Sequence, residues 1–271
     1  MARLKVGVAL SGGTAKSVAH VGVLKALVEE GIPIDCIAGT SGGSIVGALY
    51  ASGMPVSTLE NTATNMSWRK LVSIKLTRLG FVSSGAIEEF VKEMIGDITF
   101  DDLNIPMTVV AANLVTGEKR EFKQGSVPLA VRASCSIPQI YLPVEIDGEY
   151  YVDGGLSEYL PVETLLDMGC DFCIASHLGP HNPIYRRPHH ILQLVMQITG
   201  LMARKNYVNS IKKADFLIHP NLDGFSSFDF NLSADIIELG YNTTRALVGE
   251  LRRKLARSGR PWTRVWRKLR G

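Results

Sequence analysis

A serine lies among glycines in the segment Gly39-Thr40-Ser41-Gly42-Gly43, between an expected strand at Ile34–Ala38 and an expected helix from Ser44. A turn of this kind strains the serine backbone and exposes its hydroxyl, and small neighbours let a substrate carbonyl approach. The start of the following helix favours negative charge that develops nearby. The segment therefore predicts Ser41 as a nucleophile in acyl transfer.

A second glycine turn, Ser11-Gly12-Gly13-Thr14-Ala15-Lys16, also lies between an expected strand and an expected helix. Exposed backbone N–H groups at a helix start bind anions, which could be a nucleotide phosphate or the oxyanion of acyl transfer. A phosphate loop needs glycine one and six positions before the lysine, where this chain has Ala15 and Leu10. The oxyanion interpretation, which needs only N–H donors near the serine, is favoured.

A third glycine-containing segment, Asp153-Gly154-Gly155, directly follows the expected strand Glu149–Val152. Such a sequence can be a simple turn. Its glycines would also let the carboxylate of Asp153 lie at an open edge and face a reactant, so Asp153 is the candidate base.

The elements that must position these turns alternate between apolar runs and segments of helical period, which predicts a mostly parallel sheet covered by helices. Both early turns then lie at the carboxyl ends of neighbouring strands, where open α/β sheets place their sites. The segment Trp68–Ser84 is expected to be a cap or loop. The expected strands are Leu4–Leu10, Ile34–Ala38, Met107–Ala112, Lys119–Lys123, Pro143–Ile146, Glu149–Val152, Cys173–Ser176 and Phe216–His219, and the expected helices are Ala15–Glu30, Ser44–Ser52, His190–Val208 and a last one from about Ser233.

In combination these motifs resemble the patatin-like phospholipases, over residues 4–245. Supporting segments are Ala133-Ser-Cys-Ser-Ile-Pro138, Tyr141-Leu-Pro143, Leu160-Pro161, His20-Val-Gly-Val-Leu24 and Gly240-Tyr241. The resemblance implies a three-layer α/β/α fold with a mostly parallel central sheet, and hydrolysis of lipid esters by a Ser–Asp dyad without a catalytic histidine or cofactor. It implies Ser41 as nucleophile, Asp153 as base, and an oxyanion hole at Gly12, Gly13 and Thr14 with Lys16 adjoining.

Two positions depart from the family pattern, because Thr14 and Ser17 stand where glycines are usual. A β-branched residue adopts positive φ with difficulty, so an oxyanion hole that needs this geometry would be distorted. With ordinary angles the Thr14 N–H would still point into the hole, and its hydroxyl could cap the helix. We expect an active enzyme. The alternative is a catalytically weak lipid-binding or regulatory protein.

Three other chemistries stay open at lower weight. His177 or His219, each near an expected strand end, could act as the base of a Ser-His-Asp triad. Cys170-x-x-Cys173 could indicate zinc or redox chemistry, but no second Cys/His pair stands at ligand spacing, and no metal is expected. All four cysteines are expected to be reduced thiols of a cytosolic protein.

Charge is concentrated at the C-terminus, where residues 245–271 contain ten Lys/Arg residues and one acid. We therefore divide the chain into an acyl hydrolase domain, residues 1–245, and a basic helical tail, residues 246–271. With Trp262 and Trp266, the tail suits an anionic membrane surface, although a solvated helix is an equal alternative. No signal peptide, membrane span or nucleic-acid partner is expected, and the oligomeric state is not predicted. The expected location is the cytoplasm, and peripheral contact with the inner membrane surface is left open.

Overall fold

The structure is a computed structural model that describes residues 3–65, 82–181, 187–189, 191–227 and 229–258. Its centre is a mixed sheet with the strand order β5-β6-β3-β2-β1-β7-β8, to which β4 is added beside β3. The strands are β1 (Val6–Leu10), β2 (Cys36–Thr40), β3 (Met107–Asn113), β4 (Lys119–Phe122), β5 (Val144–Ile146), β6 (Glu149–Asp153), β7 (Phe172–Ser176) and β8 (Phe216–Ile218).

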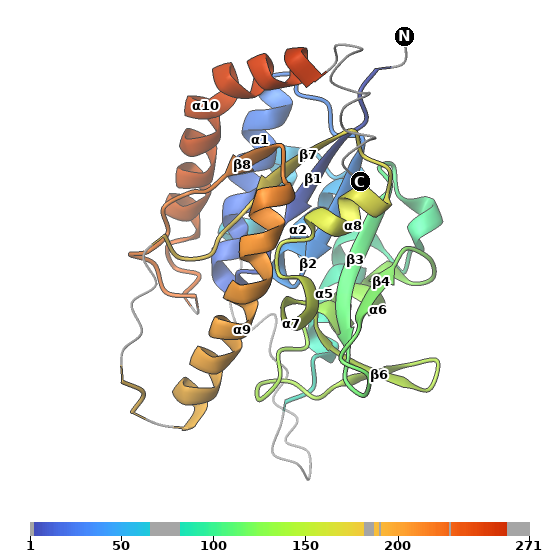
Figure 1. Ribbon diagram of the computed structural model, residues 1–271. Coiled ribbons are helices and arrows are strands. Elements are labelled where there is room, and N and C mark those ends of the chain that lie inside the picture. The colour runs from blue at the N-terminus through green and yellow to red at the C-terminus, as the bar shows by residue number, and fades with distance from the viewer. Residues whose placement is uncertain (1–2, 66–81, 182–186, 190, 228, 259–271) are drawn as a thin grey trace.

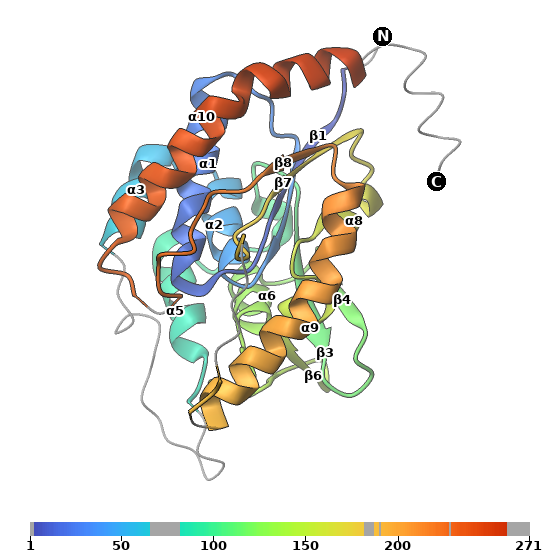
Figure 2. The ribbon, with the colours of Figure 1, turned by 60° about the vertical axis from the view of Figure 1, so that its left-hand side comes forward.

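The sheet is parallel from β3 through β2, β1 and β7 to β8, and antiparallel where β4, β5 and β6 join it. Helices cover both faces (Figures 1 and 2), so the predicted three-layer α/β/α fold is confirmed. One face carries α1 (Ala19–Glu29), α2 (Gly42–Ala51), α3 (Val56–Thr64), α5 (Gly85–Ile95), α6 (Val127–Ser134) and α10 (Ser233–Ser258), and the other carries α7 (Gly155–Glu158), α8 (Val162–Asp167) and α9 (Ile191–Lys213).

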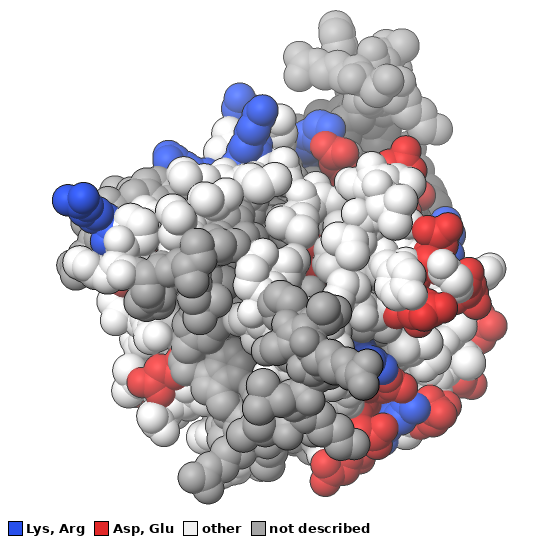
Figure 3. All heavy atoms as spheres, turned by 90° about the horizontal axis from the view of Figure 1, so that it is seen from below, with Lys and Arg blue, Asp and Glu red and all other residues white. Residues whose placement is uncertain are grey.

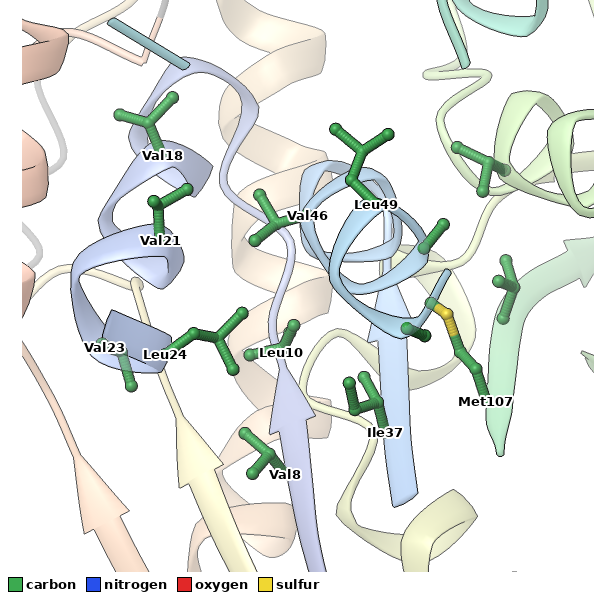
Figure 4. Packing of buried hydrophobic residues seen from close by; sticks show 14 of the residues in the cluster. Val8, Leu10, Val18, Val21, Val23, Leu24, Ile37, Val46, Leu49 and Met107 are labelled. Carbon is green, nitrogen blue, oxygen red and sulfur yellow. The ribbon is translucent and has the colours of Figure 1, made fainter. Parts of the chain in front are cut away.

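The main core lies between the central strands and the helices of the first face. Every residue of β1 and β2 is buried, as expected of parallel strands that are covered on both sides. Figure 4 shows Leu24 of α1 and Val46 of α2 around Leu10 of β1. This packing fixes the two early strands and, with them, the turns at their carboxyl ends.

Helices α1 and α10 meet at two glycines. A Cβ atom at Gly22 would overlap the backbone of Ile237, and one at Gly240 would overlap the backbone of Ala19. Only glycine allows the two helix backbones to come this close. The contact holds α10 against α1, the helix that follows the glycine turn at Ser11–Lys16.

The structure differs from the expected elements at a few boundaries. Strand β2 extends to Thr40, so it ends directly at the candidate nucleophile, and a 3-10 helix at Thr14–Val18 precedes α1. Helix α10 continues without interruption through residues 245 and 246. Residues 68–81 of the expected cap, Trp68–Ser84, and the tail residues 259–271 lie outside the described residues.

The expectation of reduced, buried cysteines holds for Cys135 and Cys173, but it is wrong for Cys36 and Cys170, which form a disulfide. Cys36 lies on β2 and Cys170 precedes β7, and the two strands flank β1 on either side. Gly7 of β1 lies between them, and a Cβ atom there would meet both sulfur atoms. The strand order brings together two cysteines that are 134 positions apart, and no local sequence pattern reveals such a pair.

Among the described residues, no helix is both long and apolar enough to span a bilayer.

Candidate active site

Ser41 forms a sharp turn between β2 and α2, with a φ of 52° and a ψ of −130°. Non-glycine residues rarely adopt positive φ, and such strain is typical of functional turns. The flanking glycines make the turn possible, because a Cβ atom at Gly39 would meet the backbone of Ser44 and one at Gly43 would meet the backbone of Leu10. The predicted strand-to-helix turn is therefore present, with Ser41 at its apex.

The strained turn is held by a residue that sequence reasoning did not identify as part of the site. The backbone N–H of Ser41 donates to the Oγ of Ser134 over 2.8 Å, and this hydroxyl donates to the carbonyl oxygen of Val110 over 2.6 Å. Ser134 is completely buried. It therefore ties the turn to β3 and to the end of α6.

Asp153 is the last residue of β6, where it pairs with Ala111 of β3. The Ser41 hydroxyl is near enough to the Asp153 carboxylate to lower its pKa, and the backbone N–H of Gly155 donates to its Oδ1 over 2.7 Å. The residue is only 8% exposed. Burial raises the pKa of Asp153 to about 6, while the Ser41 hydroxyl and the hydrogen bond from Gly155 act in the opposite direction.

The glycine turn at Ser11–Lys16 comes close to Ser41, since a Cβ atom at Gly12 would lie 3.5 Å from the Cβ of Ser41. The Gly12 N–H, however, donates to the carbonyl oxygen of Tyr159 over 3.1 Å. Within the part of the chain that the structure describes, the N–H groups of Gly13 and Thr14 have no acceptor. The N–H groups of Gly13 and Thr14 are therefore the ones in this turn that could donate to a further group.

Of the two geometries that the sequence left open, Thr14 adopts the positive one, with a φ of 48°. Its hydroxyl does not cap the helix; it donates to the carbonyl oxygen of Ser227 over 2.5 Å and also lies 2.7 Å from that of Gly13. The backbone N–H of Ala15 also donates to Ser227. These bonds offset the strain of the β-branched residue and attach the segment before α10 to the turn.

The side chain of Lys16 is held by another part of the chain. Its Nζ donates to the carbonyl oxygen of Leu222 over 2.9 Å, on the segment that follows β8. Burial lowers the pKa of Lys16, and the nearby Asp223 partly restores it. Lys16 thus anchors the segment between β8 and α10, whereas Ser41, Asp153, Gly13 and Thr14 are brought together.

An apolar pocket opens beside Ser41, among helices α1, α2, α3 and α5 of the first face. Ser41 and Thr14 lie in its wall, and nearly all of the remaining lining is hydrocarbon. The apolar lining residues are Val18, Val21, Ile45, Val46, Leu49, Leu59, Ala63, Ile87, Ile137 and Phe230. A pocket of this composition suits an acyl chain.

The histidines considered as bases have other contacts. The ring of His177 packs on Tyr207 and His219, at centroid distances of 4.3 and 4.6 Å, and burial lowers the pKa of His177 to about 3. The Nε2 of His219 lies 2.7 Å from the carbonyl oxygen of Gly179. These contacts are on the side of β7 and β8, and none of them involves Ser41.

A sequence profile described as "Patatin-like phospholipase" matches residues 8–166. The chain is 33% identical to an uncharacterized NTE family protein of Mycobacterium tuberculosis over 178 residues, which cover 65% of this chain and 49% of that protein. It is 27% identical to the lysophospholipase nte1 of Aspergillus fumigatus over 267 residues, which cover 87% of this chain and 18% of that protein. The chain thus spans about half or less of the length of these relatives.

Two solved structures share the fold. VipD from Legionella pneumophila aligns with a TM-score of 0.56 at 18% identity, over 92% of this chain and 67% of that chain. The type III effector protein ExoU aligns with a TM-score of 0.54 at 13% identity, over 94% of this chain and 54% of that chain. At these identities the likeness concerns the arrangement of helices and strands alone.

Proposed function

The chain belongs to the patatin-like phospholipase family, and from this we propose that it is a serine acyl hydrolase that cleaves carboxylic ester bonds of phospholipids or lysophospholipids. The observation that carries the proposal is the proximity of the Ser41 hydroxyl to the buried carboxylate of Asp153, beside an apolar pocket. A hydroxyl paired with a base is the arrangement that nucleophilic catalysis requires.

In the first step the Ser41 Oγ attacks the ester carbonyl carbon and forms a C–O bond, while Asp153 accepts the hydroxyl proton. The carbonyl oxygen becomes an oxyanion, which the N–H groups of Gly13 and Thr14 stabilise. Collapse of this intermediate breaks the bond to the leaving alkoxide, and Asp153 returns the proton to it. Water then attacks the acyl group on Ser41 with Asp153 as base, so that the fatty acid is released and Ser41 is restored.

A pKa of about 6 makes Asp153 a better base than an exposed carboxylate, since a general base acts best when its pKa lies near the working pH. The burial that raises this pKa also keeps water away from the hydroxyl. A bound acyl chain would exclude more water from the pocket and strengthen the interaction between the oxyanion and its donors.

A second candidate function is a catalytically weak lipid-binding or regulatory protein. The observation that favours it is the engagement of the Gly12 N–H by Tyr159, which leaves two rather than three backbone donors at the turn. The strained Thr14 is a further departure from a glycine turn. Lipid binding without release of fatty acid would support this candidate.

The location and partners of the chain are proposals of the same kind. We place it in the cytoplasm without a nucleic-acid partner, and expect the basic tail, residues 246–271, to contact anionic membranes. Some bases around the start of this tail are already paired, because Arg245 and Arg252 form ion pairs with Glu30 of α1. The basic side chains beyond α10 would therefore make most of the contact between the tail and an anionic membrane.

The test of the proposed activity is release of fatty acid from a panel of phospholipids, lysophospholipids and soluble esters. The wild-type chain should hydrolyse members of the panel, and Ser41→Ala should hydrolyse none above background. Equal rates for the two proteins would contradict the proposal. The chain-length profile of the released acids would indicate how well the apolar pocket fits each substrate.

A further inference from the structure

The outward face of helix α9 is apolar. Leu194, Ile198, Leu201, Met202 and Val208 are between 40% and 54% exposed. At 100° per residue, four of them, Leu194, Ile198, Leu201 and Val208, fall on one stripe along the helix. A surface helix of a globular protein normally presents polar residues on this side.

The opposite stripe of the same helix is the one that the fold uses. Ala203, Tyr207 and Ser210 are buried against the domain. The Nδ2 of Asn206 donates to the carbonyl oxygen of Leu156 over 2.9 Å, which attaches the helix to α7. Because these inward contacts already hold α9 in place, the outward apolar stripe has no role in holding the described fold together.

The charges of α9 indicate what the stripe contacts. Residues 191–203 contain no charged side chain, residues 204–213 contain four basic ones, and the helix has no acid at all. The exposed Lys205 and Lys212 fall on the carboxyl-terminal half of the stripe and the exposed Arg204 lies beside it, while Lys213 is paired with Glu163. In the view from below, most of the acidic side chains that can be seen lie at the right of the molecule (Figure 3). An apolar stripe with cations on it and beside it suits an anionic lipid surface, where the bases reach the headgroups.

The stripe lies near the candidate site. Helix α9 packs on α7, which begins two residues after Asp153. Its amino-terminal half, with Leu194 and Ile198, extends past α7 on the side where the parallel strands end (Figures 1 and 2). The last described residue of α10, Ser258, lies at the opposite end of the molecule in both views. A lipid surface on α9 would thus approach the end of the molecule that carries the Ser41 and Asp153 turns.

We propose that the outward face of α9 docks on an anionic lipid surface and brings the candidate site to its substrate. The inference rests on the proposed function for the reason to approach lipid, but the docking itself does not require catalysis. A second copy of the chain is a poorer occupant, because the same helix offers no acidic side chain to pair with Arg204 and Lys205.

The test uses the full chain and two sets of variants. Leu194→Glu, Ile198→Glu and Leu201→Glu together remove the apolar stripe. Val28→Glu and Leu166→Glu together form the matched control, since these residues are similarly exposed, at 44% each, on α1 and α8. Binding to phosphatidylcholine vesicles with and without phosphatidylglycerol is measured by co-sedimentation, in a Ser41→Ala background that keeps the lipid intact. The same substitutions with Ser41 retained are assayed on a soluble ester and on the same ester in vesicles.

The stripe variant should bind anionic vesicles on the order of tenfold more weakly or worse, while the control binds like the parent. Hydrolysis of the ester in vesicles should fall by a similar factor, and hydrolysis of the soluble ester should be unchanged. Binding by the parent should be weaker on vesicles without phosphatidylglycerol. If the folded variant keeps both vesicle binding and vesicle hydrolysis, the proposal is overturned.

Two further outcomes separate the possible failures. A variant that changes only from dimer to monomer by light scattering, with its vesicle binding intact, would make the stripe a self-association surface and overturn the proposal. A parent protein that hydrolyses neither ester, yet loses vesicle binding when the stripe is replaced, would contradict the proposed activity and support the docking surface.

Discussion

Replacement of Ser134 by alanine should disable the nucleophile turn without touching either catalytic side chain. The Ser134 hydroxyl accepts a hydrogen bond from the Ser41 N–H and donates one to the carbonyl oxygen of Val110. In Ser134→Ala both backbone groups lose their partner in a buried environment. The turn would also lose the contact that opposes relaxation of Ser41 from its positive φ.

The expected magnitudes follow from these contacts. A buried polar group without a partner costs about 1–3 kcal/mol, so the free energy of unfolding should fall by about 2–4 kcal/mol. The positive φ of Ser41 stores about 1–3 kcal/mol of strain, which would now favour a relaxed turn. If the relaxed turn is inactive, kcat should fall about 10- to 100-fold, while KM changes little because the apolar pocket is intact.

The assay is steady-state hydrolysis of a soluble ester, corrected for folded protein, beside chemical denaturation. Ser126→Ala is the matched control, because its hydroxyl accepts from the Leu129 N–H and caps the other end of α6. This control should lose about 1 kcal/mol of stability and keep its kcat. If Ser134→Ala has the kcat of Ser126→Ala at equal folded concentration, the reasoning about the turn is wrong.

Three more predictions follow from the charges and contacts of the site. The kcat/KM for a soluble ester should rise with pH through about 6 as Asp153 loses its proton, and a pH-independent rate from pH 5 to 8 would contradict this. The free energy of unfolding should change in the opposite sense. A carboxyl whose pKa is raised by folding stabilises the protein at low pH, and this contribution is lost as the pH rises towards 6. His177→Ala and His219→Ala should each keep most of the activity in the same assay, and a loss as large as that of Ser41→Ala would favour a triad. Truncation after Lys254 should weaken co-sedimentation with anionic vesicles and leave soluble ester hydrolysis largely intact, whereas equal binding would remove the role of the tail.

The sequence predicts the turns of the site well because each is a local pattern. Glycine, serine and aspartate after an apolar run mark a turn at a strand end, because they adopt turn conformations that other residues avoid. The alternation of strands and helices then places the turns at one edge. Gly39 illustrates this, since its close backbone contacts are with Gly43 and Ser44 of the same turn.

The rest of the site depends on contacts between distant parts of the chain. Ser134 lies 93 positions after Ser41, and nothing in its neighbourhood reveals that it accepts the Ser41 N–H. The bond from Gly12 to Tyr159 likewise becomes visible only when the two segments are packed together. A sequence pattern identifies which groups could donate hydrogen bonds, whereas the tertiary structure decides which donors are already used.

The central claim, that Asp153 activates Ser41, is tested most directly by covalent labelling with a fluorophosphonate and mass-spectrometric location of the adduct. The account predicts an adduct on Ser41 in the wild-type chain, none at this position in Ser41→Ala, and much slower labelling in a folded Asp153→Asn protein. An adduct on a different serine, or equal labelling rates for Asp153→Asn and the wild type, would contradict it.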